Sequence, residues 1–276
     1  MAIKLIALDL DGTTLKDNNE ISEETIRAFK LAMEKGIHIV ISTGRCFHSL
    51  PDGIKSVKGL EYAVTSNGAE IRVLDTQKCI YRNCIDSKAI EEIYKVLTKY
   101  NYMTEVFTDG RAYISEKEYN EVLEGKHPHR TIKYVTETRN KVPDSMEFMM
   151  NNKETIENIN VFFENQEEKD KMYPILDSIK NVTLTSSLVS NYELGGETTS
   201  KASALKELAS RIGVCYDEIM AVGDSPNDIE MLKLAKVSVA VANARQSVKD
   251  VAAYMTDSNN DDGVAKAILK YAINEN

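Results

Sequence analysis

Two aspartates that follow directly on a short apolar run constrain this chain more than any other feature. Residues 3–8 have the length and apolar character of a buried strand, and the run ends at Asp9 and Asp11. Residues i and i+2 of an extended segment point to the same side, so we expect both carboxylates to lie just past the strand end. Like charges held that close repel each other unless a cation or a proton lies between them. The pattern indicates a metal site that contains a nucleophile.

The composition is that of an ordinary globular protein with an acidic balance. Of the 276 residues, 42% are hydrophobic and 28% are charged, and the net charge is −9. This length allows one large domain or two of modest size. The negative charge argues against a nucleic-acid partner. A chain this acidic has to supply local positive charge to an anionic substrate from a metal ion, a lysine or backbone N–H groups.

Neither the cysteines nor the apolar segments indicate export or a membrane role. The four cysteines show no C-x-x-C pair and no metal-ligand spacing, so we interpret them as reduced thiols. No apolar run approaches the ~18 residues of a membrane helix, and the N-terminus begins as a strand rather than a signal peptide. We therefore expect a cytoplasmic protein with no membrane partner, and either a monomer or a dimer fits the sequence.

The two ends of the chain alternate strand and helix. Continuous apolar strands of this kind are typical of a parallel sheet that is covered on both faces. Ser22 has the position of an N-cap for the first helix. The pattern predicts an α/β fold with a Rossmann-like parallel-sheet core, whose strands are residues 3–8, 37–41, 62–65, 219–222 and 237–241.

The middle of the chain has a different texture. Between residues 84 and 188, helical patterns mix with a strand and with a hairpin around Thr108–Gly110. We expect an inserted α/β domain here, which would act as a lid over the substrate. The predicted domains are a discontinuous core, residues 1–83 plus 189–276, and a cap, residues 84–188.

Four polar clusters stand at strand ends or at a helix start, where parallel sheets bind ligands. Mg²⁺ takes one or two carboxylates together with substrate phosphate, so Asp9 and Asp224, with the backbone carbonyl of Asp11, would suit it. Asp9 can then be a carboxylate nucleophile. Asp11 can be the general acid for the leaving oxygen and afterwards the base for water. Donors of the kind that phosphate needs are the Ser42 hydroxyl, the Thr43 and Gly44 amides, Lys201 and Asn227.

Each cluster alone has a plainer interpretation. D-x-D-G-T is more often a solvated turn than a catalytic site, and S-T-G-R could equally be a turn. A calcium loop is excluded because Gly12 is the fourth residue rather than the sixth, and because a strand precedes it. Lys201 would by default lie on the surface, and residues 223–228 could be an ordinary N-cap. Four such coincidences, in order and each at a strand end or helix start, favour a site.

Taken together, the motifs resemble Cof-type phosphatases of the haloacid dehalogenase (HAD) superfamily, the subclass IIB branch with a large α/β cap. The matching segments span the predicted core and are Asp9–Thr13, Ser42–Arg45, Asn67–Gly68, Lys201–Leu205, Gly223–Asp228, Asn243–Ala244 and Asp262–Val264. Three positions depart from the usual pattern, and they concern loop geometry rather than a charged group: Ala202, Lys236 and Ala242.

The resemblance implies a role for each matching residue. Asp9 is expected to be the nucleophile and Asp11 the acid and base. Mg²⁺ is expected on Asp9, Asp11 and Asp224, with Asp228 in support. The phosphate-binding residues are expected to be Leu10, Ser42, Thr43, Gly44, Lys201 and Asn227.

The chemistry favours hydrolysis of small phosphorylated metabolites through an aspartyl-phosphate on Asp9, with sugar phosphates favoured by the resemblance alone. A dehalogenase needs no proton donor, whereas a phosphatase must protonate an alkoxide, and Asp11 supplies that proton. A phosphomutase of the same superfamily, or a non-catalytic binder of phosphometabolites, are the alternatives. His127, His129 and Arg130 could recognise the rest of the substrate, although we favour a solvated loop for that segment.

Overall fold

The computed structural model describes residues 2–127 and 130–273, which form two compact units. The first unit comprises residues 1–44, 50–81 and 200–276, and the second comprises residues 45–49 and 82–199. The expected return to the core at residue 189 is too early, because strand β11 (Asn191–Gly196) pairs with β9 (Ile156–Phe162) in the second unit. The short segment 45–49 also belongs to that unit, since the His48 amide donates to the Gly110 carbonyl.

The first unit is built on an eight-stranded sheet in the order β14-β13-β12-β1-β2-β3-β4-β5. The strands from β14 to β3 run parallel, and β4 is antiparallel to β3. This arrangement confirms the predicted Rossmann-like core. Its strands are β1 (Leu5–Leu8), β2 (His38–Ser42), β3 (Tyr62–Thr65), β4 (Glu70–Val73), β5 (Cys79–Arg82), β12 (Ile219–Gly223), β13 (Val237–Ala240) and β14 (Tyr254–Met255).

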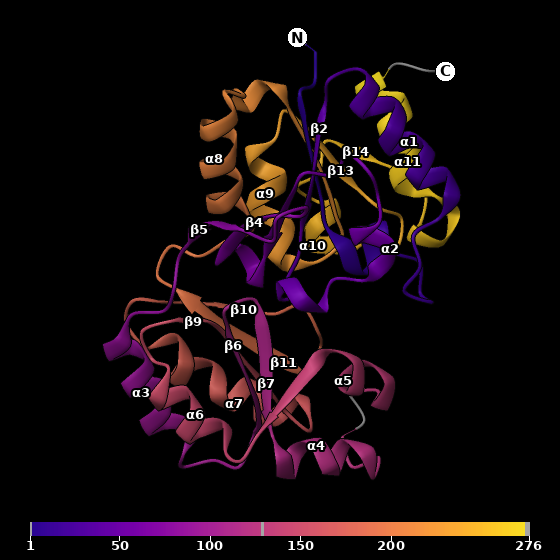
Figure 1. Ribbon diagram of the computed structural model, residues 1–276. Helices are drawn as coiled ribbons and strands as arrows, with labels where there is room; N and C mark the ends of the chain where they lie inside the picture. The colour runs from indigo at the N-terminus through magenta and orange to yellow at the C-terminus, as the bar shows by residue number, and fades with distance from the viewer. Residues whose placement is uncertain (1, 128–129, 274–276) are drawn as a thin grey trace. The chain divides into compact units, whose positions relative to one another are not determined.

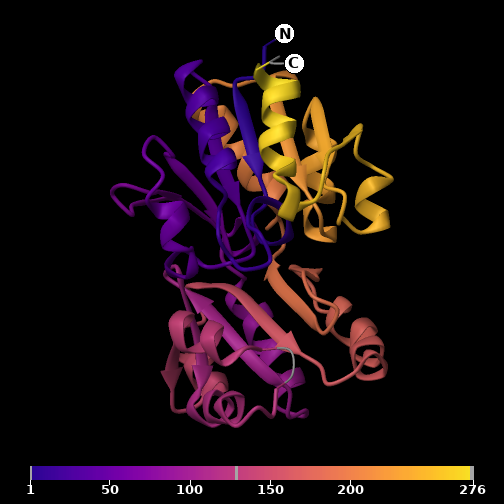
Figure 2. The same ribbon diagram turned by 90° about the vertical axis from the view of Figure 1, so that its right-hand side faces the viewer.

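Helices cover both faces of this sheet, with α1 and α11 on one face and α8 and α9 on the other (Figures 1 and 2). Helix α1 begins where expected, because the Ser22 hydroxyl accepts a hydrogen bond from the Thr25 amide. It turns Ala28, Phe29 and Ala32 into the core. The helices of this unit are α1 (Glu23–Glu34), α2 (Asp52–Lys55), α8 (Lys201–Ile212), α9 (Ile229–Leu234), α10 (Gln246–Lys249) and α11 (Gly263–Ala267).

The register of the sheet brings the ends of its central strands together. Leu8 of β1 pairs with Val222 of β12 and with Ile41 of β2. The next residues along these strands, Asp9 and Ser42 among them, therefore emerge at the same edge of the sheet.

The second unit contains a six-stranded sheet in the order β10-β11-β9-β6-β7-β8. Thr108 of β6 pairs with Arg111 of β7, which confirms the predicted hairpin. The remaining strands are β6 (Met103–Thr108), β7 (Arg111–Ser115), β8 (Arg139–Val142) and β10 (Val182–Thr185). The helices are α3 (Ser87–Leu97), α4 (Glu116–Leu123), α5 (Ile132–Thr138), α6 (Ser145–Asn151) and α7 (Gln166–Asp177).

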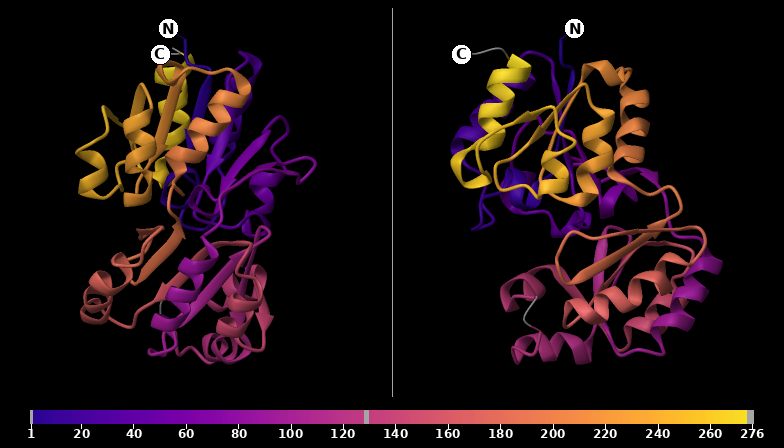
Figure 3. Two further views of the ribbon diagram at one scale, coloured as in Figure 1. Left: turned by 90° about the vertical axis from the view of Figure 1, so that its left-hand side faces the viewer. Right: turned by 180° about the vertical axis from the view of Figure 1, so that it is seen from behind.

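Alternation along the strands gives this second sheet two apolar faces. Val106 and Val161 pack with α3, α6 and α7 on one face, and Met103 and Phe162 pack with α4 and α5 on the other (Figure 3). All four cysteines are free thiols, as the sequence predicts. Within the described residues, the helices are too short or too polar to cross a membrane.

Candidate active site

The segment after β1 forms a tight turn that depends on a glycine. Asp9 is followed at once by a π-helical turn, Leu10–Thr14, in which Gly12 has a φ of 73°. A Cβ atom on Gly12 would lie 3.0 Å from Asp224 Oδ2. Any side chain would be strained at this φ and crowded against Asp224, so glycine brings the Asp9 turn and the loop after β12 together.

Three carboxylates and one ammonium group meet at the end of β1. Asp9, Asp224 and Asp228 each place an oxygen within 4.8 Å of the others. Lys201 Nζ donates to Asp9 Oδ1 at 2.5 Å and to Asp228 Oδ1 at 2.7 Å. Asp9, Lys201 and Asp228 are all buried, so these charges interact with little screening by water.

The charges in this cluster do not balance. Burial raises the pKa of Asp9 well above its usual range, and the neighbouring Asp228 raises it further, although Lys201 opposes both effects. Burial alone would lower the pKa of Lys201, but Asp228 and Asp9 outweigh it and raise that pKa. Burial and Asp228 likewise raise the pKa of Asp224. An ionised Asp9 therefore needs more positive charge than Lys201 supplies.

A divalent cation fits that requirement. Asp224 is oriented by the Thr13 hydroxyl, which donates to Oδ1 at 3.1 Å, and by the Ser225 hydroxyl, which donates to Oδ2 at 3.0 Å. Carboxylate oxygens without histidine or cysteine are the donor set that Mg²⁺ prefers. Asp9 and Asp224 are thus the residues that would hold the ion.

Asp228 holds the loop after β12 in place through hydrogen bonds from that loop's backbone amides. Its Oδ2 accepts hydrogen bonds from the amides of Asp224 and Ser225, both at 3.0 Å. A Cβ atom on Gly223 would lie 2.6 Å from the Asp228 Cβ, so only glycine fits at the end of β12. With Oδ1 bound to Lys201, both oxygens of Asp228 are engaged. The supporting role that the resemblance implies for Asp228 stays a prediction.

Asp11 lies apart from the carboxylate cluster. The sequence predicts that the carboxylates of Asp9 and Asp11 converge, but Asp11 is exposed and the cluster contains Asp224 and Asp228 in its place. The reason is that Asp11 sits inside the turn, one residue before Gly12, rather than on a continued strand. An exposed carboxyl two residues after the buried Asp9 can exchange protons with solvent, as a general acid must.

The end of β2 offers a buried hydroxyl for phosphate. Ser42 Oγ is fully buried and, among the described residues, has no hydrogen-bond partner, which is the state of a donor that a ligand completes. The expectation for the Thr43 amide is wrong, because that N–H donates to the Val64 carbonyl at 2.9 Å. Leu10 and the Gly44 amide stay predicted phosphate contacts.

Asn67 joins three loops at this edge. It has a φ of 56° and accepts a hydrogen bond at Oδ1 from Asn227 Nδ2 at 3.0 Å. A Cβ atom on Gly44 would lie 3.1 Å from the same oxygen. Asn227 is therefore held by the loop after β3, a role for Asn67 that the sequence reasoning missed although it noted the Asn67–Gly68 motif.

Lys201 reaches the site because its helix begins in a fixed place. The Ser200 hydroxyl caps α8 by accepting from the Ser203 amide at 3.0 Å. A Cβ atom on Gly68, whose φ is 99°, would lie 2.1 Å from the Ser200 carbonyl oxygen. The loop after β3 and the start of α8 thus make backbone contact that only glycine allows.

Two further contacts were not predicted from the sequence. Asn243 Nδ2 donates to the Gly12 carbonyl at 2.7 Å, and the Thr13 hydroxyl holds Asp224. Both residues lie in the matching motifs, but a motif alone gives no partner. The three departures from the family pattern, Ala202, Lys236 and Ala242, all have a negative φ, so none of these positions requires glycine.

With this geometry in place, comparison with known proteins identifies the class. The family of haloacid dehalogenase-like hydrolases matches residues 6–268. The chain belongs to this family, as the sequence motifs predict.

Individual relatives agree over the full length. A 5-amino-6-(5-phospho-D-ribitylamino)uracil phosphatase, YcsE of Bacillus subtilis (strain 168), is 30% identical over 98% of this chain and 96% of its own length. Phosphatase YwpJ of the same organism is 33% identical over 95% and 98%. The expected class of enzyme, a phosphoric monoester hydrolase, is confirmed by the family and these relatives together.

Solved structures confirm the fold. A haloacid dehalogenase-like hydrolase from B. subtilis superposes with a TM-score of 0.84 at 29% identity, covering 98% of this chain and 99% of that one. The subclass IIB sugar phosphatase BT4131 superposes with a TM-score of 0.81 at 24% identity, covering 98% and 99%.

Proposed function

We propose that this chain is a Mg²⁺-dependent phosphatase that hydrolyses small phosphorylated metabolites through an aspartyl-phosphate on Asp9. One observation carries the proposal: a buried carboxylate at the end of β1 lies against Lys201 and shares its cluster with Asp224, where negative charge is in excess. Buried negative charge that Lys201 does not balance costs stability, which supports a functional reason for the cluster.

The first chemical step uses both aspartates of the opening motif. An Asp9 oxygen attacks phosphorus while the bond between phosphorus and the ester oxygen breaks. Asp11 gives its proton to the departing oxygen, which leaves as an alcohol. Lys201 favours the ionised form of Asp9 and, with the Ser42 hydroxyl, offers donors to the phosphoryl oxygens. Mg²⁺, which Asp9 and Asp224 would hold, would supply positive charge that offsets the negative charge of the carboxylates and the phosphate.

The second step regenerates the enzyme. Asp11, now a carboxylate, takes a proton from a water molecule as its oxygen attacks phosphorus of the aspartyl-phosphate. The bond between phosphorus and the Asp9 oxygen breaks, and inorganic phosphate leaves. Because Asp11 is exposed, its proton can equilibrate with solvent between turnovers.

For the substrate, we propose a phosphorylated sugar or sugar alcohol. The substrate in the name of YcsE, the relative from B. subtilis, carries its phosphate on a D-ribityl chain, which derives from a sugar alcohol. That relative aligns over nearly its whole length, so its substrate class supports a polyol phosphate for this chain as well.

The test is phosphate release from a panel of sugar phosphates, sugar-alcohol phosphates and p-nitrophenyl phosphate, with Mg²⁺ and with EDTA. We expect release with Mg²⁺, none with EDTA, and none from a folded Asp9→Asn variant. Full activity of Asp9→Asn would rule out the aspartyl-phosphate. Isomerisation of a sugar phosphate without release would indicate a mutase, and tight binding without turnover would indicate a binding protein.

A further inference from the structure

The second unit contains a cavity of about 860 Å³ that none of the active-site residues lines. It lies between the end of α3, the first residue of β6, the end of β9 and the early turns of α7, with Arg130 on one wall. Its volume falls within the range of small-molecule sites, which is roughly 300–1,000 Å³. We call it the Arg130 cavity.

Four cationic side chains and two carboxylates line this cavity, in a chain whose net charge is −9. Two carboxylates line it, Glu164 and Glu168, and Lys126 also contacts Glu124 outside the lining. The lining residues with a permanent positive charge are Lys99, Lys126, Arg130 and Lys171. A local excess of cations in an acidic protein raises the concentration of anions at that place.

Arg130 is fixed in position before any ligand arrives. Its side chain is 9% exposed, and NH2 donates to Glu105 Oε2 at 2.6 Å. The guanidinium lies over the Phe162 ring at 4.2 Å and over the Tyr134 ring at 5.2 Å. These contacts contradict the solvated loop that we favoured for Arg130 from the sequence. Of the two histidines named with it, His127 contacts Glu121 at 3.3 Å, and His129 lies outside the described residues.

The charge behind Arg130 is not balanced. Glu105 is fully buried, and the same Oε2 that binds Arg130 also accepts from Arg139 at 2.8 Å. Burial alone would raise the pKa of Glu105, but the two arginines outweigh it and lower that pKa, so one ionised carboxylate serves two guanidinium groups. Arg130 Nε has no hydrogen-bond partner in the described part of the chain. Arg130 lines the cavity and shares its one carboxylate with Arg139, so its positive charge is only partly offset, which suits an oxyanion.

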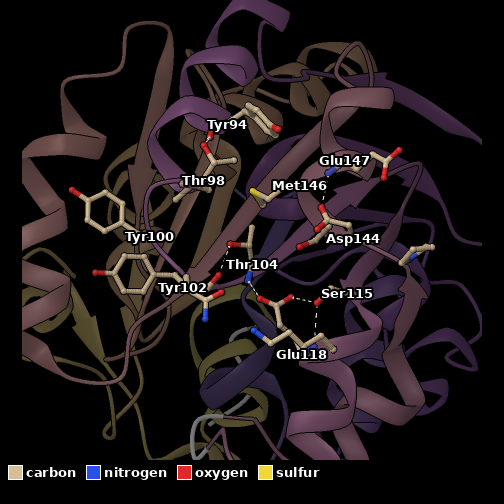
Figure 4. A pocket seen from close by; sticks show the side chains of 15 residues that line it. Tyr94, Thr98, Tyr100, Tyr102, Thr104, Ser115, Glu118, Asp144, Met146 and Glu147 are labelled. Carbon is tan, nitrogen blue, oxygen red and sulfur yellow. Dashed lines mark hydrogen bonds between the residues drawn. The ribbon is translucent and has the colours of Figure 1, made fainter.

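The other wall of the cavity is aromatic. The Tyr100 and Tyr102 rings are stacked with centroids 5.6 Å apart, and Tyr102 meets Phe163 edge to face at 4.9 Å. Figure 4 shows the Tyr100 and Tyr102 side chains side by side among the residues that line a second pocket, which shares both tyrosines with the Arg130 cavity. Phe162 and Met103 add apolar surface. These rings make that wall aromatic and apolar, the kind of surface against which a planar ring packs.

We propose that the Arg130 cavity binds a small organic anion in which a phosphate, sulfonate or carboxylate group is attached to a planar ring. The anionic group lies against Arg130 with Lys171 at the rim, and the ring packs against Tyr102 and its neighbours. Since every lining residue belongs to the second unit, this binding does not require that the chain be a phosphatase.

The probe that tests the proposal is 1-naphthalenesulfonate, which has the anion and the ring but no phosphoryl group to hydrolyse. Isothermal titration of the full-length protein should show one saturable site whose affinity falls as NaCl is added. Neutral 1-naphthalenemethanol and inorganic sulfate should each bind at least tenfold more weakly. Equal binding of the neutral alcohol would overturn the anion site, and equal binding of sulfate would overturn the aromatic part.

Two variants locate the site. Arg130→Met keeps the length of the side chain and should weaken binding of 1-naphthalenesulfonate about tenfold or more, the loss of a charge-assisted hydrogen bond. Arg111→Met, at an exposed position of β7, is the matched control and should bind normally. Lys171 is exposed on α7, so Lys171→Gln should leave folding unchanged. This variant should weaken binding of 1-naphthalenesulfonate severalfold. Unchanged affinity in either cavity variant contradicts the proposal.

Discussion

The ammonium group of Lys201 lies 2.5 Å from Asp9 Oδ1, although 192 positions separate the two residues in the sequence. The lysine stands at the first position of α8, and the aspartate directly follows β1. This contact joins the amino-terminal and carboxyl-terminal parts of the first unit at the point where the proposed chemistry occurs. Stability and activity should therefore depend on the same ion pair.

Replacing Lys201 by Met should damage both properties. It leaves Asp9 and Asp228 buried without their shared cation, and breaking a buried pair in this way costs about 3–5 kcal/mol. We expect urea denaturation to show a loss of that size and phosphatase turnover to fall to background. Lys206→Met, on the exposed face of the same helix, is the control and should change neither. A Lys201→Met protein as stable as the parent would contradict the role given to this contact.

Asp11→Asn should separate the two chemical steps. Without a proton donor, esters with a poor leaving group should suffer more than p-nitrophenyl phosphate, whose phenolate leaves unaided. Without a base, the aspartyl-phosphate should persist. Stopped-flow measurements should show one equivalent of p-nitrophenol released quickly, followed by slow turnover. Asp52→Asn, at an exposed position, should behave as the parent. Equal losses in the rate of aspartyl-phosphate formation from both kinds of ester would show that Asp11 is not the acid.

Gly68→Ala should unfold the start of α8. The added Cβ would lie 2.1 Å from the Ser200 carbonyl at a φ of 99°, so the loop or the helix has to move. Gly36→Ala is a matched control, because Gly36 also has a positive φ, 75°, but no atom within 4 Å of an added Cβ. We expect Gly36→Ala to lower the free energy of unfolding by about 1–2 kcal/mol through backbone strain, and Gly68→Ala to lower it clearly more. Equal losses in urea denaturation would show that the Ser200 contact is not tight.

Local patterns explain why the core could be predicted from the sequence. Strand β3 was predicted to the residue, and Ser22 caps α1 as expected, because both depend on neighbours within a few positions. The grouping of Asp9 with Asp224 also followed, since parallel strands bring their carboxyl ends together, whereas Lys201 reaches them from the start of α8.

What failed were features that depend on distant partners. The Thr43 amide was predicted to be a donor to phosphate, but it donates to the Val64 carbonyl of the neighbouring strand β3. The Arg130 side chain looked solvated, because nothing near it in the sequence predicts the buried Glu105 of β6. The end of the inserted domain was misplaced because the sequence of β11, Asn-Tyr-Glu-Leu-Gly-Gly, does not indicate which sheet the strand joins, and only its pairing with β9 assigns it to the second sheet.

The final prediction concerns Glu118, in the second unit, whose carboxyl group bridges two elements in a pocket (Figure 4). Oε1 accepts from the Thr104 amide at 3.0 Å, and Oε2 accepts from the Ser115 hydroxyl at 2.7 Å. Burial raises the pKa of Glu118 to about 7, although both hydrogen bonds oppose the rise. The folded protein therefore holds a proton at Glu118 that the unfolded chain releases near pH 4.5.

The sign of the effect on stability follows from this difference. Between pH 4.5 and about 7 the native state binds more protons at Glu118 than the unfolded state, so the free energy of unfolding falls as pH rises. At about 1.4 kcal/mol for each pKa unit, the loss attributable to Glu118 is about 3 kcal/mol. Glu118→Gln keeps the acceptor for Thr104 and removes the titration. The variant should gain stability relative to the parent as pH rises from 5 to 8, measured by urea denaturation at each pH. Glu116→Gln, exposed on the same helix, should follow the parent, and parallel curves for the parent and Glu118→Gln would show that the Glu118 pKa is not raised.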